Sequence, residues 1–149
     1  MRWINCDRNL IPVLAPLMEV VPTANAIIVA EFDNETPIAA AIYDQYNGKS
    51  IHSHIWISPG RKPTRQFWFA TCDYVFRQCR VETIVAYVSS RNIKSQKLTE
   101  HLGYELQSVI PNFYPDGTDA LVYVGSPELA FDWRRFKPKF RGKTVTLAA

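Results

Sequence analysis

The stretch that decides the fold is 83–104, TIVAYVSSRNIKSQKLTEHLGY. Its first six residues, 83–88, are apolar and rich in β-branched and aromatic side chains, which is typical of a short buried strand. The hydrophobic period then changes, and 93–102 is predicted to form a helix. Gly103 follows at once and suits the left-handed position after a helix, because glycine has no Cβ to strain there. The stretch therefore predicts a strand followed by a helix.

A longer helix is predicted before this strand, beginning after Thr64 as its N-cap. Apolar side chains recur there with the helical period over about four turns. The stripe contains Phe67, Trp68, Thr71, Cys72, Tyr74, Val75, Gln78 and Cys79. We expect Phe67, Trp68, Tyr74 and Val75 to pack on a sheet and Arg77 to be exposed. A helix between two strands also implies a parallel strand pair with a right-handed crossover.

Three strand-like runs precede that helix, at 26–32, 38–46 and Ser50–Ile57. Asn47-Gly48 between the last two is a strong hairpin signal, since both positions of such a turn have positive φ. The three runs are therefore predicted to form an antiparallel meander.

The two ends of the folded part are predicted from simpler patterns. The apolar spacing of 10–21 indicates an amphipathic helix, which Pro12 and Pro16 make short or broken. Glu105–Ile110 and 120–124 form a hairpin across the turn Pro115-Asp116-Gly117. The predicted fold class is α/β (α+β), with a mixed central sheet and helices on both faces.

Composition limits the class of protein. The 149 residues are 47% hydrophobic and 21% charged, which suits one globular domain over 1–125. The extension 126–149 is basic, with six Lys or Arg against two Asp or Glu. The three cysteines lack a C-x-x-C spacing, so neither zinc nor a disulfide framework is expected. With no apolar run of spanning length and no signal-peptide core, we expect a cytoplasmic protein without a membrane partner.

The segment 92–104 resembles the N-x-x-S/A…LGF/Y signature of the GCN5-related N-acetyltransferase (GNAT) superfamily. The order of predicted elements is also similar to that family's order, over 26–124. Residues 74–78, the signature and Asp116-Gly117 resemble GNAT-like proteins encoded by phages and prophages. The resemblance implies a GNAT-like sheet with an antiparallel meander, a β-α-β crossover and a C-terminal hairpin. It also implies transfer of an acetyl group from acetyl-CoA to a primary amine.

The same resemblance implies that acetyl-CoA lies between the strands Ser50–Ile57 and 83–88, with its phosphates at the start of the crossover helix. The family's Q/R-x-x-G-x-G/A pattern is absent from 58–66, and Pro63 lacks an N–H donor. Cations near the helix start are nevertheless suited to phosphates. The expected coenzyme-binding residues are Trp56, Ile57, Ser58, Gly60, Arg61, Lys62, Arg65 and Asn92. Asn92 would contact the pantetheine arm or cap the helix that follows it.

Two histidines are the main candidates for a general base. Strand alternation places His52 and His54 on one face with Trp56, and a neutral imidazole can accept the proton of an ammonium. Glu31 and Asp33 are alternative carboxylates. The family's acidic tyrosine is replaced by Thr99, whose hydroxyl is too weak an acid to protonate a thiolate, and Tyr104 is expected to pack.

Three functions are compatible with these observations. The first is acetyl transfer from acetyl-CoA to a primary amine of a small molecule or protein. The second is a GNAT-shaped binding or structural protein that has lost catalysis. The third is nucleic-acid binding by Trp133, Phe136 and Phe140 among the basic residues of the extension, although no nucleic-acid motif supports it. The sequence leaves the acceptor and the oligomeric state open.

Overall fold

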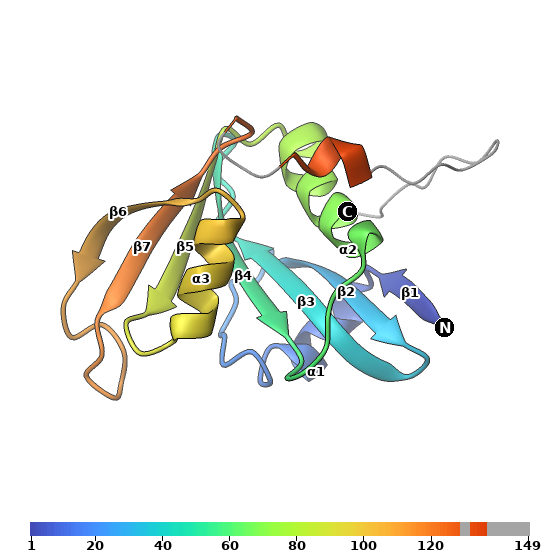
Figure 1. The fold of residues 1–149 in the computed structure, drawn as a ribbon, viewed down its shortest axis with the longest axis horizontal. Coiled ribbons are helices and arrows are strands. Elements are labelled where there is room, and N and C mark those ends of the chain that lie inside the picture. Colours follow the sequence, from blue (N-terminus) through green and yellow to red (C-terminus); the bar gives the residue numbers. More distant parts are fainter. Residues whose placement is uncertain (129–131, 137–149) are drawn as a thin grey trace.

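The computed structural model describes residues 1–128 and 132–136, and Figure 1 shows their fold. Within these residues a mixed sheet has the strand order β1-β2-β3-β4-β5-β7-β6. The strands are β1 (Arg2–Asn5), β2 (Ile27–Asp33), β3 (Thr36–Asp44), β4 (Ser50–Ile57), β5 (Thr83–Ser89), β6 (Glu105–Ile110) and β7 (Ala120–Gly125). The helices are η1 (Arg8–Leu10), α1 (Ile11–Leu14), α2 (Arg65–Cys72), η2 (Asp73–Gln78), α3 (Ile93–His101) and η3 (Trp133–Phe136).

The predicted meander is confirmed, because β2, β3 and β4 pair in antiparallel fashion in that order. The strands β3 and β4 are joined across Asn47-Gly48 as predicted, but the positive φ expected at both positions is found only at Gly48. The connection spans 45–49, and its positive φ values are at Gln45 (55°) and Gly48 (91°), with Asn47 outside the left-handed region. The Asn47 side-chain oxygen instead accepts hydrogen bonds from the N–H groups of Lys49 and Ser50. Asn47 thus shapes the turn through its side chain, as Asx residues commonly do.

The helix that connects β4 to β5 begins as predicted, with the Thr64 hydroxyl accepting from the N–H of Phe67 at 3.3 Å. After α2 the backbone widens into the π-helical turn η2. A buried Asp73 there accepts two hydrogen bonds from the Arg77 guanidinium. Strand β4 precedes this helix in the sequence and β5 follows it. The two strands pair in parallel, which confirms the predicted parallel pair.

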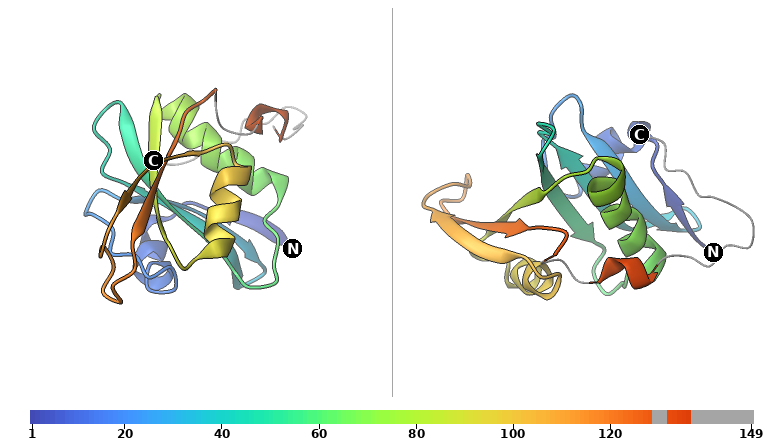
Figure 2. Two further views of the ribbon diagram at one scale, coloured as in Figure 1. Left: turned by 60° about the vertical axis from the view of Figure 1, so that its left-hand side comes forward. Right: turned by 90° about the horizontal axis from the view of Figure 1, so that it is seen from above.

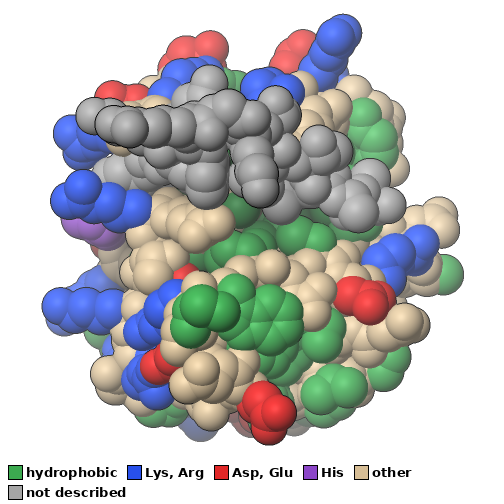
Figure 3. All heavy atoms as spheres, turned by 90° about the vertical axis from the view of Figure 1, so that its right-hand side faces the viewer, with side chains coloured by type: hydrophobic (Ala, Val, Ile, Leu, Met, Phe, Trp, Pro, Cys, Tyr) green, Lys and Arg blue, Asp and Glu red, His purple; other side chains and the backbone are tan. Residues whose placement is uncertain are grey.

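The first helix is short, as the two prolines predict, and consists of η1 and the single turn α1. The strand β1 before it was not predicted. It pairs with β2 over only four residues and forms one outer edge of the sheet. Figure 3 views the molecule from this side and shows hydrophobic side chains gathered between charged ones. Trp3 of β1 remains 38% exposed and stacks on Phe32.

The helices cover both faces of the sheet, with α2 and α3 on one face and α1 on the other (Figures 1 and 2). Phe67 and Val75 are fully buried in the core under α2, and Tyr74 is 7% exposed. Trp68 is half-buried against the same core, and Arg77 is exposed. These placements confirm the helical stripe predicted from the sequence.

Residue Trp133 of η3 packs against α2 and η2, with ring centroids 5.7 Å from Phe69 and 6.2 Å from Phe76. It is only 3% exposed, so its ring cannot stack on a base, and this part of the nucleic-acid hypothesis is wrong. Phe140 and most of the basic extension 126–149 lie outside the described residues. In the described ranges no helix is both long and apolar enough to cross a membrane.

The core under α2 gives a direct test of the fold. Val75→Asp would bury a carboxylate without a partner, so we expect the free energy of unfolding to fall by about 3–5 kcal/mol. Urea denaturation measures this change. The matched control is Gln66→Asp, which adds the same group at an exposed site in the first turn of α2. Equal stability of the two variants would contradict the packing described above.

Candidate functional site

The sheet opens between its two halves. Strands β4 and β5 are paired only over Ser50–His52 and Thr83–Val85, and beyond these residues they diverge behind α3 in the view of Figure 1. A cavity of about 720 Å³ fills the gap. It is lined from β4, β5, α3, the loop between β6 and β7, and the segment 18–21 after α1. Backbone groups of 53–55 and 86–88 that face the gap have no strand partner across it, so they can bind a ligand.

Strand alternation divides this cavity into two halves. On β4, Ser53 and Ile55 face α3, while His52 and His54 point to the face that carries α1. On β5, Ala86 and Val88 lie on the α3 face and Tyr87 lies on the opposite face. The α3 half comprises Ser53, Ile55, Ala86, Val88, Asn92, Ser95, Leu98, Thr99, Leu102 and Tyr104. The loop half comprises His52, His54, Tyr87, residues 18–21 and residues 113–116.

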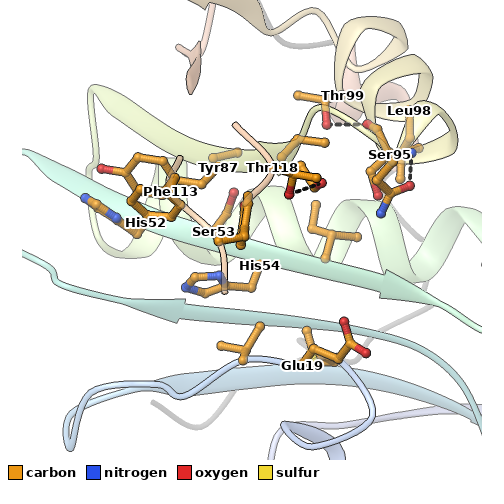
Figure 4. Close-up of a pocket in the computed structure, with 18 of the residues that line it drawn as sticks. Glu19, His52, Ser53, His54, Tyr87, Ser95, Leu98, Thr99, Phe113 and Thr118 are labelled. Atoms are coloured by element: carbon orange, nitrogen blue, oxygen red, sulfur yellow. Dashed lines mark hydrogen bonds between the residues drawn. The ribbon is translucent and has the colours of Figure 1, made fainter. Parts of the chain in front are cut away.

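Figure 4 shows this division, with Ser95, Leu98 and Thr99 together on one side and His52, Tyr87 and Phe113 together on the other. The cavity therefore passes through the sheet at the point where the strands separate. A ligand in one half can reach a ligand in the other only through this opening.

A buried carboxylate orients one of the two histidines. The Nε2 of His54 lies 3.1 Å from Oδ1 of Asp44, which is only 4% exposed. The other oxygen of Asp44 accepts the N–H of Thr23 at 3.2 Å. A neutral His54 that donates Nε2–H to Asp44 keeps the lone pair of Nδ1 for another proton. Such an Asp–His pair is an arrangement suited to general-base chemistry.

The second histidine is arranged differently. Nδ1 of His52 lies 3.3 Å from Nε2 of Gln45, an amide nitrogen that can only donate, so the basic lone pair of His52 is already engaged. Burial lowers the pKa of His52, while the carboxylate of Asp44 opposes this shift and His54 adds to it. The shift favours the neutral imidazole of His52, and its ring lies 5.3 Å from that of Tyr87.

The structure separates Glu31 from both histidines. Glu31 is 1% exposed and lies on the α2 face of the sheet. Its carboxylate accepts hydrogen bonds from the N–H and hydroxyl of Thr64 and from Arg2. Glu31 thus binds the start of α2, and this placement does not favour it as a base in the cavity. Asp33 is held by Arg61 at 2.8 Å.

The residues expected to hold the coenzyme fall into two groups. Asn92 lines the α3 half and also caps α3, because its side-chain oxygen accepts the N–H of Ser95 at 3.1 Å. The others lie outside the cavity. Trp56 packs on the α1 core, Ile57 packs on the α2 core, and the N–H of Ser58 pairs with β3. Gly60, Arg61, Lys62 and Arg65 lie in the loop before α2 or at its first residue.

Sequence reasoning missed Asp44 and the aromatic side chains Tyr87 and Phe113. Alternation along 38–46 places Asp44 on the face of Ile42, and antiparallel pairing sets it opposite His52. That register was the available signal for Asp44. Phe113 gave no comparable signal, because it lies in a loop whose path depends on tertiary contacts.

The α3 half holds a hydroxyl and a phenol that are poor acids. The Thr99 hydroxyl donates to the carbonyl of Ser95 at 2.7 Å. Burial raises the pKa of Tyr104 well above its ordinary value. Tyr104 also packs over Gly125, since a Cβ at that glycine would lie 2.6 Å from the phenol ring. The ring therefore acts as a wall of the cavity, as expected for a packing residue.

No protein-family model matches the sequence, and no curated protein matches it. Solved structures are similar in fold. Spermidine/spermine N-acetyltransferase SpeG from Vibrio cholerae, in complex with manganese ions, shows a TM-score of 0.67 at 15% identity, covering 84% of this chain and 92% of that chain. The same enzyme in complex with CoA and spermine gives a TM-score of 0.67 at 15% identity, covering 86% of this chain and 96% of that chain. Its dodecameric structure in an intermediate state gives a TM-score of 0.66 at 15% identity, covering 84% of this chain and 93% of that chain. The predicted GNAT-like fold is thereby confirmed.

The contact between Gly125 and Tyr104 can be tested by substitution. Gly125→Ala should lower the free energy of unfolding by about 1–3 kcal/mol, because the added methyl group displaces a packed ring. Combined with Tyr104→Leu, the same change should cost less than it does alone, and a double-mutant cycle by chemical denaturation measures the difference. Strictly additive effects would show that the ring does not limit residue 125.

Proposed function

We propose that this protein is an acyl-CoA-dependent N-acetyltransferase that moves an acetyl group from acetyl-CoA to a primary amine. The observation that carries the proposal is the cavity through the sheet, with unpaired strand edges on one side and the Asp44–His54 pair on the other. The GNAT fold of the solved neighbours supports it. Acetyl-CoA supplies an acetyl group that is already activated as a thioester.

The α3 half fits the pantetheine arm of the donor. This arm is narrow and carries amide groups, which need hydrogen-bond partners along an otherwise apolar channel. The unpaired backbone groups of β4 and β5 provide such partners, and Ile55, Val88 and Leu98 provide apolar walls. Asn92 retains amide hydrogens while its oxygen caps α3.

The phosphates of the donor are proposed to lie at the start of α2, near Gly60, Arg61, Lys62 and Arg65. First-turn N–H groups of a helix lack intrahelical partners, and the loop adds cations. Lys62 is exposed there. Glu31 and Asp33 oppose this attraction, because Glu31 accepts the N–H of Thr64 and Asp33 pairs with Arg61. The cations of the loop are therefore proposed to contribute more to phosphate binding than the N–H groups at the start of α2.

His54 is the proposed general base. The acceptor arrives as an ammonium, loses one proton to Nδ1 of His54, and attacks the acetyl carbon with the freed lone pair. A carbon–nitrogen bond forms and the carbon–sulfur bond breaks. Backbone N–H groups on the open edge of β4 would stabilise the carbonyl oxygen during attack. After attack the nitrogen still carries one proton too many and releases it to water as the amide forms, while the leaving thiolate takes a proton from water, since Thr99 and Tyr104 are poor acids.

The cysteines are not needed for this reaction. Burial raises the pKa of Cys6 to about 11 and that of Cys72 to about 12, so both are protonated, unreactive thiols at pH 7. Direct transfer without a covalent enzyme intermediate is therefore the proposed route. The SpeG neighbours act on spermidine and spermine, which makes polyamines one candidate acceptor class. A cytoplasmic location belongs to the same proposal.

The alternative is a catalytically degenerate GNAT-fold binding or structural protein, related to those of phages. Two observations favour it. The start of α2 already binds a carboxylate of the protein, and Thr99 stands where many GNAT proteins have an acidic tyrosine. Calorimetry with acetyl-CoA separates the two functions, because only the transferase requires the donor.

Removal of the loop cations tests the phosphate site. Arg61→Ala combined with Arg65→Ala should weaken acetyl-CoA binding at least tenfold, or about 1.4 kcal/mol, in calorimetry. The control removes two cations from the exposed side of α3, as Lys94→Ala with Lys97→Ala. If the loop variant keeps the affinity of the control, the phosphates lie elsewhere.

The pH profile of kcat/KM tests the base. We expect kcat/KM to fall as pH decreases, because a protonated base cannot accept a proton. His54→Gln should lower kcat at least 100-fold and remove the acidic limb, Asp44→Asn should lower kcat less, and Thr99→Val should have little effect.

The profile also distinguishes the two histidines. Burial holds the pKa of His52 below its ordinary value near 6.5, so a limb due to His52 would lie below that value. Such a limb would survive His54→Gln and disappear in His52→Gln. That pattern would assign the base to His52.

A further inference from the structure

Aromatic rings form a continuous series along the loop half of the cavity. The ring of Tyr87 lies between His52, at 5.3 Å, and Phe113, at 5.5 Å, and it is nearly parallel to Phe113 with an interplanar angle of 16°. Phe113 in turn meets Tyr114 edge to face at 5.0 Å. We call these four rings the aromatic ladder. It connects β4 and β5 to the loop between β6 and β7.

One ring of the ladder is exposed. Phe113 is 46% exposed although it lines the cavity. An apolar ring on the rim of a cavity gains free energy when a ligand covers it. The position of the ladder beside His54 places such a ligand next to the proposed base (Figure 4).

The charges of the loop half select a cation. Among the described residues that line the cavity there is no Lys or Arg, whereas Glu19 and Asp116 contribute carboxylates. Hydrogen bonds from Thr118 lower the pKa of Asp116, and Arg91 lies 4.0 Å from its carboxylate. Glu19 has no ion pair within the described part of the chain. The loop half therefore presents one unpaired carboxylate, one buried Asp–His pair and several aromatic faces, all of which favour an ammonium.

From these observations we infer the class of acceptor: a primary amine that carries an aromatic ring on a short alkyl chain. The inference rests on the proposed acetyl transfer. The ring would stack on the exposed side of Phe113, which is backed by Tyr87, and the ammonium would approach His54 and Glu19. Offset stacking of two aromatic rings is favourable beyond the burial of their area, so a flat ring is preferred over a saturated one. A polyamine leaves the ladder without a stacking partner, and an acceptor with a carboxylate is repelled by Glu19.

The experiment compares three acceptors with the full-length chain. They are 2-phenylethylamine, 2-cyclohexylethylamine, which has the same carbon skeleton without the flat ring, and spermidine. We expect kcat/KM for 2-phenylethylamine to exceed that of either other amine at least tenfold. Phe113→Leu should abolish most of this preference and leave the affinity for acetyl-CoA unchanged. The control Trp3→Leu removes an exposed aromatic side chain at the far edge of the sheet and should keep the preference.

Two results would overturn the inference: a preference for spermidine, or equal use of the two monoamines together with no effect of Phe113→Leu. Failure of the transferase proposal looks different, since acetyl-CoA would not bind and no amine would be acetylated. Calorimetry with the two monoamines alone then still decides the inference. Tighter binding of 2-phenylethylamine that is lost in Phe113→Leu supports it, and equal binding of both amines rejects it.

Discussion

The separation of β4 from β5 is the constraint on which the rest of the structure depends. Each strand has a stronger attachment on its other side, because β4 pairs with β3 over six residues and β5 pairs with β7 over six residues, while the two share only three pairs. Twist accumulates in each half of the sheet. Once the halves diverge, the backbone N–H and C=O groups of β4 and β5 can no longer hydrogen-bond to one another. The gap becomes a channel lined by these donors and acceptors.

The opening determines which side chains can cooperate. Residues two apart on β4 face the same side, so His52 and His54 share the loop half while Ser53 and Ile55 face α3. Asp44 joins the histidines because β3 and β4 are in antiparallel register. A slip of one residue in that register would turn both imidazoles toward α3 and separate them from Asp44. The chemistry proposed for the site is thus a consequence of strand register.

Much of the fold was predictable because its signals are local. The alternation of 26–32, 38–46 and Ser50–Ile57, the N-cap Thr64 and the stripe with Phe67 and Val75 each depend on neighbours along the chain. The strand β1 was missed, since four residues at a sheet edge carry too short a pattern. The turn after β3 lies where Asn47-Gly48 predicted it, but the backbone of Asn47 differs from the expected one, because its side chain shapes the turn instead.

The site was less predictable because it depends on tertiary contacts. His52 and His54 follow from alternation alone. Their different partners, Gln45 and Asp44, depend on the path of the turn after β3 and on the pairing of strands. Phe113 reaches Tyr87 only because the loop between β6 and β7 folds over the end of β5. Glu31 is the opposite case. Its position on β2 and its carboxylate suggested a general base, but in the fold the carboxylate binds Thr64 at the start of α2.

The placement of Glu31 also changes how the proposed donor would be held. A helix N-terminus favours a nearby anion by roughly 0.3–1 kcal/mol at an exposed site, and part of that attraction is already satisfied by a carboxylate that cannot leave because it is buried. Arg2 lies 3.3 Å from Glu31, and Asp33 pairs with Arg61 at 2.8 Å and with the N-terminal ammonium at 3.1 Å, so both carboxylates are already paired with cations. Lys62 adds an exposed positive charge to the same loop. Donor binding in the proposed reaction would then rely on the charge of loop side chains, in place of the glycine-rich amide cradle that this sequence lacks.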